Sequence, residues 1–281
     1  MINLPFEIDL KDKVAVVTGA GGVLCSLFAK AIARCGAKVA LLDLNLEAAA
    51  KFAADIAAEG GTAKAYAANV LKKETLLEAR EQIRRDFGTC DILVNGAGGN
   101  NPRATTTNEY YLDGDMEKDI TTFFNLEPAG VEFVFNLNFL GTLIPTQVFA
   151  EDMLGKEDAS ILNVSSMNAF TPLTKIPAYS GAKAAVSNFT EWLAVHFSKA
   201  NIRVNAIAPG FFVTAQNQAL LFDEAGNPTA RTAKILNSTP MGRFGEAEEL
   251  IGSLLFLLSK PAAGFITGVV IPVDGGFSAY S

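Results

Sequence analysis

Short apolar runs rich in β-branched residues alternate along this chain with longer amphipathic stretches. The apolar runs have lengths typical of buried strands and are bounded by glycine, proline or polar residues. They predict seven strands, near residues 14–17, 38–42, 63–67, 91–94, 160–164, 202–207 and 269–273. The amphipathic stretches predict helices near residues 27–33, 46–58, 74–86, 135–153, 179–193 and 247–258. Strands and helices that alternate over short links indicate a parallel sheet with right-handed crossovers.

Two segments interrupt this alternation. Residues 99–134 are rich in Thr, Asn and Asp and carry several aromatic residues. Long connections of this kind are often lids or binding loops, and a surface excursion or subunit contact explains the composition equally well. Residues 211–242 are polar and irregular and are expected to form a substrate loop. Neither segment resembles a domain linker. We therefore expect one doubly wound α/β domain over residues 1–281, with helices on both faces of about seven strands.

Composition narrows the class of protein. The 281 residues are 49% hydrophobic, enough for a sizeable core, and the net charge of −7 argues against a nucleic-acid partner. No apolar run reaches the ~18 residues that span a bilayer, and the first residues lack the features of a signal peptide. We therefore expect a cytoplasmic protein without a membrane partner.

Residues that commonly hold metals or act as nucleophiles are few. Cys25, Cys35 and Cys90 lack metal-ligand spacing, so we expect free thiols in a reducing compartment and no metal site. His196 is the single histidine, which argues against a histidine-based triad. We interpret it as structural, because it follows Trp192 by four residues in a predicted helix.

Tyr179 and Lys183 form the first candidate for chemistry. Residues four apart lie on one face of a helix, so a phenol and an ammonium would project together. A free tyrosine has a pKa near ~10, and a neighbouring cation lowers it toward values useful for acid–base catalysis. The spacing alone is weak evidence, because it also occurs by chance on solvated helices.

A glycine-rich turn forms the second candidate. Gly19, Gly21 and Gly22 follow the first predicted strand and precede a helix, which is the arrangement that presents backbone amides to a pyrophosphate. Asp43 ends the second strand, about 20 residues on, where a carboxylate accepts ribose hydroxyls and repels a 2′-phosphate. This favours NAD over NADP. The alternative is that Asp43 only caps the helix that follows it.

In this order, the motifs resemble those of the short-chain dehydrogenase/reductase family over essentially the whole chain. Each motif alone is weak, but their number and spacing together are specific. The matching positions are Thr18-Gly19, Asp43, Asn95-Gly96-Ala97-Gly98, Asn138, Ser166, Tyr179-x-x-x-Lys183 and Pro209-Gly210. The resemblance implies a Rossmann-type fold and an NAD(P)-dependent oxidoreductase acting on CH–OH groups.

The resemblance also implies roles for four catalytic residues. Tyr179 would be the general acid–base, and Ser166 would polarise the reacting carbonyl or alkoxide. Lys183 would lower the pKa of Tyr179 and hold the nicotinamide ribose. Asn138 would position a water molecule that links Lys183 to solvent.

The cofactor site carried over from the family includes two departures. Its residues would be Thr18, Gly19, Gly21, Gly22, Val23, Leu24, Asp43, Asn69, Val70, Asn95, Gly96, Ala97, Gly98, Tyr179, Lys183, Pro209, Gly210, Phe212 and Thr214. The family's last two turn glycines fall here on Val23 and Cys25, and we expect the Cys25 side chain to displace the helix or face the cofactor. Asn69 replaces a usual aspartate near the adenine.

A narrower resemblance points to the D-mannonate oxidoreductase, or fructuronate reductase, branch of the family. The segments that carry it are residues 165–170, 174–179 and 208–212, with Gln216-Asn217 and the long insertion after Gly98. A polyhydroxy acid needs several hydrogen-bonding side chains and a cation. The candidate substrate residues are Asn100, Arg103, Ser166, Asn168, Lys175, Tyr179, Gln216 and Asn217.

Two alternatives stay open at this point. A gluconate 5-dehydrogenase-like or other sugar or polyol dehydrogenase would share the cofactor and catalytic residues. A catalytically idle NAD-binding scaffold or sensor would explain Val23 and Cys25, although it would have no need of four intact catalytic positions. The family further implies a homotetramer.

Overall fold

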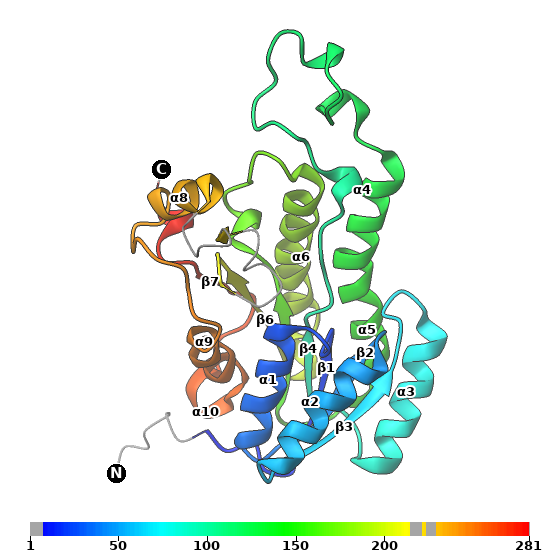
Figure 1. Cartoon of the computed structure of the whole chain (residues 1–281). Helices are drawn as coiled ribbons and strands as arrows, with labels where there is room; N and C mark the ends of the chain where they lie inside the picture. The colour runs from blue at the N-terminus through cyan, green and yellow to red at the C-terminus, as the bar shows by residue number, and fades with distance from the viewer. Residues whose placement is uncertain (1–7, 214–220, 223–228, 281) are drawn as a thin grey trace.

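A computed structural model describes residues 8–213, 221–222 and 229–280, and shows one seven-stranded sheet. All neighbouring strands are parallel, in the order β3-β2-β1-β4-β5-β6-β7 (Figure 1). The strands are β1 Val14–Thr18, β2 Lys38–Asp43, β3 Thr62–Ala67, β4 Ile92–Asn95, β5 Ala159–Val164, β6 Ile202–Pro209 and β7 Val270–Val273. The predicted doubly wound α/β fold is confirmed.

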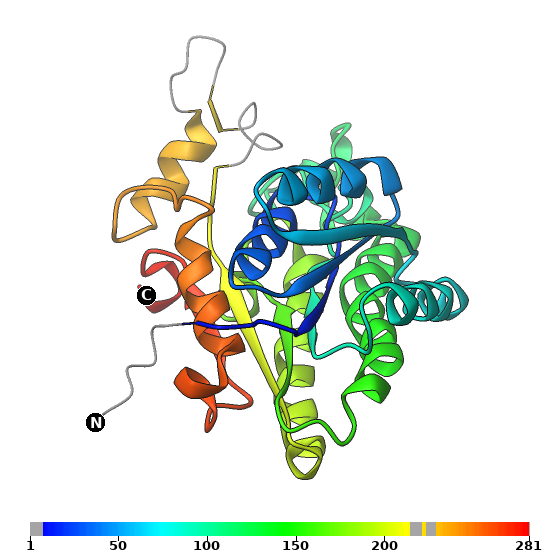
Figure 2. The same cartoon turned by 90° about the horizontal axis from the view of Figure 1, so that it is seen from below.

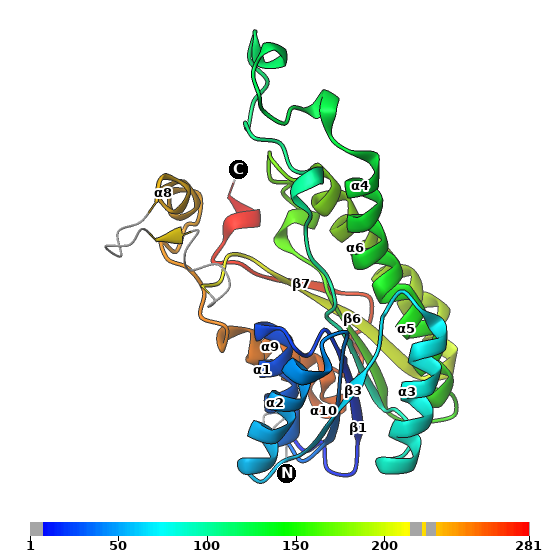
Figure 3. The same ribbon diagram turned by 45° about the vertical axis from the view of Figure 1, so that its right-hand side comes forward.

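Helices cover both faces of the sheet. Within the described residues they are α1 Val23–Arg34, α2 Leu46–Ala58, α3 Lys73–Asp86, α4 Pro128–Phe135, α5 Gly141–Phe149, α6 Pro177–His196, α8 Ala230–Asn237, α9 Glu249–Leu258 and α10 Lys260–Ala263. Helices α1, α2 and α9 lie on one face and α3, α5 and α6 on the other (Figures 2 and 3).

The central strand shows why two cores form. Successive side chains of a strand point to opposite faces. In β1, Ala15 and Val17 belong to the core under α1 and α9, whereas Val14 and Val16 belong to the core under α3 and α5. Because both faces are covered, the strand is apolar throughout, as parallel strands usually are.

The strand order reverses between β1 and β4, and this reversal places the site. β1 pairs with β2 on one side and with β4 on the other, with Thr18 opposite Asn95 at the carboxyl ends. Ligands of open α/β sheets bind outside the carboxyl ends of strands at such a switch point. Both predicted small-residue turns follow these two strands.

Helix boundaries differ from prediction in two segments. α4 begins at Pro128, seven residues before the predicted start, because proline suits the first helical position. The irregular insertion is therefore shorter than the predicted range of 99–134. The predicted irregular loop at 211–242 contains α8, whose Thr229 side chain accepts a hydrogen bond from the backbone of Thr232.

The continuous helical stretch Pro128–Met153 is long and apolar enough, by length and composition alone, to cross a membrane. Its length comes from α4, a π-helical segment at Asn136–Leu140, α5 and a 3-10 turn at Ala150–Met153. Half of its apolar window is buried within the domain, which accounts for its composition. The expectation that no run has this length is thus corrected.

Residues 107–126, which we call the arm, project beyond the N-terminal end of α4 (Figures 1 and 3). Two backbone hydrogen bonds mark its base, from Thr106 to Lys175 and from Glu127 to Arg103. Within it, the buried Asp115 carboxylate accepts hydrogen bonds from the Leu112 amide and the Lys118 ammonium.

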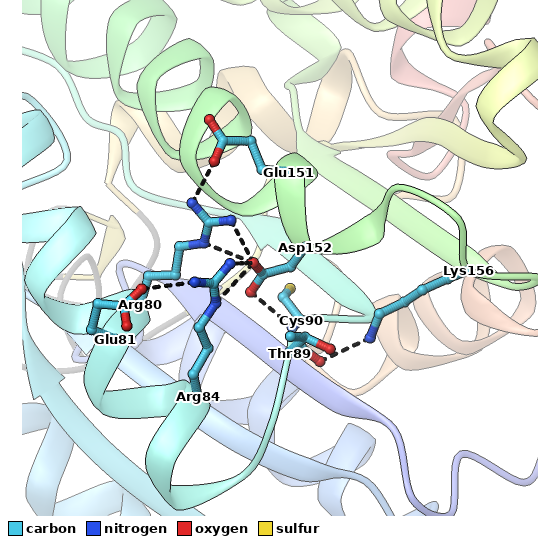
Figure 4. A network of polar contacts seen from close by, with 8 residues as sticks. All are labelled: Arg80, Glu81, Arg84, Thr89, Cys90, Glu151, Asp152 and Lys156. Atoms are coloured by element: carbon cyan, nitrogen blue, oxygen red, sulfur yellow. Dashed lines mark hydrogen bonds and ion pairs between the residues drawn. The ribbon is translucent and has the colours of Figure 1, made fainter.

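A charged network joins α3 to the end of α5 (Figure 4). The buried Asp152 carboxylate accepts hydrogen bonds from Arg80 Nε at 2.7 Å, Arg84 Nη2 at 2.5 Å and the Cys90 amide at 3.2 Å. Arg80 also pairs with Glu151 at 2.6 Å. The network ties three segments that are distant in sequence on one face of the sheet.

Candidate active site

Tyr179 and Lys183 lie on the first turns of α6, as predicted. Pro177 starts this helix, and the Lys183 Nζ atom lies 5.7 Å from the centre of the Tyr179 ring. Lys183 is 5% exposed, whereas Tyr179 is only partly buried. The structure therefore brings the phenol and the amine together at the carboxyl end of the sheet.

The Lys183 amine is anchored to the end of β5. Its Nζ atom donates a hydrogen bond of 2.8 Å to the Val164 carbonyl. Burial lowers the pKa of Lys183 to about 8, and the nearby Cys25 thiol opposes this shift. A Cβ atom at Gly98 would lie 3.1 Å from Nζ, so the missing side chain leaves the amine its room.

The surroundings of Tyr179 differ from the expectation. Burial raises the pKa of Tyr179, and a hydrogen bond with Ser166 only partly opposes this. Burial also lowers the pKa of Lys183 to about 8, so this amine carries less positive charge near neutral pH than an exposed lysine does. The lowering of the Tyr179 pKa by Lys183 stays a prediction.

Ser166 begins a 3-10 turn at Met167–Ala169 that follows β5. Its Oγ atom accepts a hydrogen bond of 3.3 Å from the Asn168 amide, which leaves the hydroxyl proton available to donate. The Asn168 side chain is buried, and its Oδ1 atom has no hydrogen-bond partner among the described residues. Such an acceptor costs free energy unless a ligand donates to it.

Asn138 lies in the π-helical segment, a feature that often marks functional sites. Its Nδ2 atom donates to the carbonyls of Val134 and Gly99, both at 2.8 Å, and its Oδ1 atom accepts from the Gly99 amide at 3.2 Å. The side chain thus fixes the backbone that follows the second small-residue turn. These contacts do not involve a water molecule, so the role of Asn138 in positioning one stays a prediction.

A cleft of about 410 Å³ opens where β1 and β4 end. Its walls come from the two small-residue turns, the start of α1 and the ends of β2 and β3. The lining residues are Gly19, Gly22, Val23, Leu24, Cys25, Asp43, Leu44, Ala68, Asn69, Val70, Gly96, Ala97, Gly98 and Leu137. Most of the predicted cofactor residues are among them.

The start of α1 fits a pyrophosphate. Gly22 precedes the helix in an extended conformation and offers no side chain to cap the free amides of the first turn. These amides and the helix dipole favour an anion. Gly19 has φ of 68°, and a Cβ atom there would lie 2.8 Å from Ala97 Cα, so only glycine lets the turns meet.

Asp43 stands at the edge of this cleft and does not cap the next helix. Its carboxylate accepts hydrogen bonds from the amides of Gly21 and Asn45, both at 2.8 Å. The cap of α2 is instead Asn45, whose side chain accepts from the Ala48 amide at 3.1 Å. The capping alternative is therefore wrong, and the carboxylate is held rigidly beside the glycine-rich turn.

Cys25 packs against the second small-residue turn. A Cβ atom at Gly96 would overlap the Cys25 Sγ atom, so the cysteine side chain occupies the space beside a glycine. Burial raises the pKa of the Cys25 thiol to about 12, with Lys183 lowering it and Asp43 raising it. The lack of a side chain at Gly96 therefore leaves room for Cys25, which stands where the family has glycine. Sequence reasoning missed this pairing, because the residues are distant along the chain.

Other predicted cofactor residues lie around rather than in the cleft. Thr18 is fully buried, and its hydroxyl accepts a hydrogen bond from the Gly96 amide at 3.1 Å. Asn95 is buried and donates to Thr146 and Asn163, both at 2.9 Å.

Three more predicted positions lie at the ends of β6 and β7. Pro209 ends β6, and a Cβ atom at Gly210 would lie 2.6 Å from Asp274 Cα, so glycine permits the close approach of the two chains. Phe212 is buried beside Gly245. Thr214, Gln216 and Asn217 lie outside the described residues.

The remaining substrate candidates make local contacts. Asn100 donates to the Thr105 hydroxyl at 2.9 Å, and Arg103 is exposed and pairs with Glu127 at 3.2 Å. Lys175 is exposed, and its carbonyl accepts the hydrogen bond from Thr106. None of these is buried beside Ser166 as Asn168 is.

Two observations concern metals and thiols. Within residues 8–213, 221–222 and 229–280, no cluster of three histidine, cysteine or acidic side chains could hold a metal ion. All three cysteines are free thiols, as expected, with Cys25 and Cys90 buried.

Comparison with known proteins identifies the family. The family model described as enoyl-(acyl carrier protein) reductase matches residues 24–278. A crystal structure of a Haemophilus influenzae protein with bound NAD, provisionally named a D-mannonate oxidoreductase, is 64% identical with a TM-score of 0.95. The match covers 99% of each chain.

Two further relatives match over nearly their whole length. An uncharacterized oxidoreductase of Bacillus subtilis named UxuB is 48% identical and covers 99% of each chain. The gluconate 5-dehydrogenase of Gluconobacter oxydans is 32% identical and covers 98% of each chain. The chain belongs to the short-chain dehydrogenase/reductase family, and it is an NAD(P)-dependent oxidoreductase acting on CH–OH groups.

Proposed function

We propose that this enzyme uses NAD to interconvert D-fructuronate and D-mannonate. The observation that carries the substrate is the 64% identity, over 99% of the chain, with the Haemophilus protein provisionally named a D-mannonate oxidoreductase. The same protein binds NAD, which supports this cofactor here. The chemistry rests on the juxtaposition of Tyr179, Lys183 and Ser166 beside the cleft.

The protein side of the reaction is proton transfer and orientation. The nicotinamide cofactor supplies or accepts the hydride when bound. In the reducing direction, Tyr179 Oη gives its proton to the carbonyl oxygen of the substrate as negative charge develops there. Ser166, whose hydroxyl proton is free to donate, hydrogen-bonds the same oxygen and stabilises that charge.

Lys183 and Asn138 support these two groups. We assign to Lys183 the holding of the nicotinamide ribose and the electrostatic support of the Tyr179 phenolate. Its buried amine, fixed to the Val164 carbonyl, gains charge below pH about 8. Asn138 fixes the Gly99 backbone beside it and is assigned the water that links Lys183 to solvent.

The adenosine half would lie along the cleft beside Asp43. Two backbone hydrogen bonds fix this carboxylate in place, and it can still accept hydrogen bonds from the two ribose hydroxyls. A 2′-phosphate there would face a fixed negative charge. NAD is therefore proposed in preference to NADP.

Polar side chains around the site would recognise the sugar acid. The unpartnered Oδ1 atom of Asn168 suits a substrate hydroxyl, and Asn100 would supply another hydrogen bond. Arg103 and Lys175 are the two basic residues among the substrate candidates, and either would pair with the carboxylate of the substrate. Gln216 and Asn217 are also assigned to the substrate from the sequence resemblance.

Gluconate 5-dehydrogenase activity is the second candidate. The Gluconobacter relative named for it favours this assignment, and 5-keto-D-gluconate would engage the same catalytic residues.

We further propose a cytoplasmic homotetramer without nucleic-acid or membrane partners. Its negative charge supports the absence of nucleic acid. Large apolar side chains exposed on α4 and α6, among them Phe133, Trp192 and Val195, support assembly.

The test is NADH oxidation with D-fructuronate, 5-keto-D-gluconate and an acyl ketone in parallel. We expect turnover on D-fructuronate, and Tyr179→Phe should reduce it by about 10²–10⁴-fold because the proton donor is gone. NADH binding, followed by fluorescence, should remain within about twofold in that variant.

Each other outcome has a definite meaning. Turnover on 5-keto-D-gluconate alone would move the substrate to the second candidate. An active Tyr179→Phe enzyme would remove the proposed acid–base role. NADH binding without turnover on any of these compounds would mean that the substrate is a different alcohol or carbonyl compound.

A further inference from the structure

The arm carries a cluster of exposed aromatic side chains. Phe123 and Phe124 are 70% and 66% exposed, and Tyr110 and Tyr111 accompany them at the surface. Phe124 makes edge-to-face contacts with both Phe123 and Tyr111, at centroid distances of 5.7 and 5.6 Å. A contiguous apolar cluster on a projecting segment marks an interaction surface rather than a core.

The arm is built to hold this cluster in place. Asp115 is buried within it and accepts hydrogen bonds from Leu112, Asn108 and Lys118. The aromatic turn is capped reciprocally, with Phe124 donating to the Thr122 hydroxyl at 3.3 Å and Thr122 donating to the Asn125 side chain. A surface whose order is already fixed loses less entropy on binding.

An apolar groove of about 520 Å³ lies at the other end of the same helical layer. It runs between the last turns of α5 and α6. Its lining includes Leu143, Leu154, Phe189, Trp192 and His196. The rings of Phe189, Trp192 and His196 stack in sequence, at centroid distances of 6.2 and 4.7 Å, and form an aromatic wall.

The cluster and the groove lie at opposite ends of one face. The arm extends beyond the N-terminal end of α4, and the groove lies where α5 and α6 finish (Figures 1 and 3). The helical stretch Pro128–Met153 runs from the base of the arm to the far end of the groove, and its 26 residues correspond to ~39 Å. A twofold axis across the middle of this layer would therefore bring each arm over the groove of a second copy.

We propose that the arm of one subunit docks its aromatic cluster into the α5–α6 groove of a second copy of this chain. Twofold symmetry makes the contact twice, since each copy offers both surfaces. Aromatic rings against an aromatic wall match the composition of energetically dominant interface sites. The inference rests on the proposed self-association and adds to it the segment that clasps the partner.

Cross-linking between two different chains, each with one exposed cysteine, tests the contact directly. In a Cys35→Ser background, one chain carries Phe124→Cys and the other Leu154→Cys, while Cys25 and Cys90 stay buried. Mixing and mild oxidation should give a disulfide-linked pair of the two chains. Leu44→Cys, an exposed position beside the cofactor cleft, replaces Leu154→Cys as the matched control and should give no such pair.

Sedimentation measures what the contact contributes. The double variant Phe123→Ser/Phe124→Ser should weaken self-association at least tenfold, whereas Leu44→Ser should leave it unchanged. All three side chains are exposed, so circular dichroism should stay the same in both variants. Activity at concentrations where the assembly persists should also be retained, since the arm holds no proposed catalytic residue.

Three outcomes overturn the inference. The arm has no role if the Phe123→Ser/Phe124→Ser variant associates as strongly as the wild type. The same conclusion follows if the chains associate but the 124–154 cross-link does not form. In both cases the proposed assembly itself would still stand. A wild-type chain that is monomeric throughout removes both. None of these results bears on the fructuronate assay, so failure of the proposed chemistry remains separately visible.

Discussion

At the scale of the residue, a glycine of the second small-residue turn makes room for Cys25 in the nucleotide site. Cys25 adds a side chain at a position where the family has glycine, and Gly96 on the facing turn has no side chain to meet it. The Sγ atom lies where a side chain at position 96 would begin, and a Cβ there would overlap it. The turn and the helix therefore keep their close approach although the usual glycine is absent.

A double-mutant cycle tests whether Cys25 and a side chain at position 96 compete for the same space. Gly96→Ala alone should destabilise the fold by roughly 1–3 kcal/mol, since the new Cβ meets a well-packed sulfur atom. Cys25→Gly should preserve or tighten NADH binding, because it restores the family turn. The double variant should recover most of the loss, with a coupling of about 0.5–3 kcal/mol in urea unfolding. Additive effects would show that the two positions do not share this space.

At the scale of the element, buried polar contacts hold the helices in the register that the site requires. Asn163 on β5 accepts from Asn95 on β4 and donates to Thr190 on α6, both at 2.9 Å. On the same face, Asp152 joins α3 to the end of α5 through Arg80 and Arg84 (Figure 4). These contacts fix how α5 and α6 lie against the sheet, and α6 carries Tyr179 and Lys183.

Asp152→Asn should destabilise the protein and change its response to acid. Burial alone would raise the pKa of Asp152, but hydrogen bonds from Arg84 and Arg80 outweigh it and lower the pKa. Its contribution to stability is therefore complete above the unfolded value of ~3.9 and lost as pH falls through the lower folded value. Removing one partner of a buried ion pair costs roughly 3–5 kcal/mol at pH 7.

Urea unfolding between pH 7 and pH 3 measures this effect. The wild-type midpoint should fall on acidification more than the Asp152→Asn midpoint, which starts lower. Asp55→Asn, on the exposed face of α2, should follow the wild type throughout. Equal acid sensitivity in Asp152→Asn and wild type would show that the carboxylate is not responsible.

At the scale of the whole molecule, the seven strands follow from the apolar runs, because the inner strands β1, β4, β5 and β6 are buried almost throughout and all seven runs are bounded by small or polar residues. The facing of Tyr179 and Lys183 follows equally from helical periodicity. The hydrogen bond from Lys183 to the Val164 carbonyl could not be predicted from the sequence. Every residue has a backbone carbonyl, and nothing in the sequence distinguishes this one. The contact of Cys25 with Gly96 joins positions distant along the chain and depends on side-chain volume in three dimensions.

Errors at the boundaries have a similar origin. The polar composition of the arm masks the start of α4 at Pro128, although a proline after an acidic residue was an available signal. Helix α8 is short and lies in a polar stretch, so its helical periodicity is not evident from the sequence. In both places the helix has a local start signal, Pro128 for α4 and the Thr229 cap for α8, but polar flanking sequence hides the helical period.

Because the domain is single, cofactor binding should stabilise the whole molecule, and Asp43 should decide which cofactor does so. NADH at one hundred times its Kd should add about 2.7 kcal/mol to the free energy of unfolding. NADPH at the same concentration should add much less, because its 2′-phosphate would face the carboxylate held by Gly21 and Asn45. Asp43→Ala should narrow this difference in thermal unfolding, and Asp55→Ala should preserve it. An unchanged difference in Asp43→Ala would mean that another group reads the ribose.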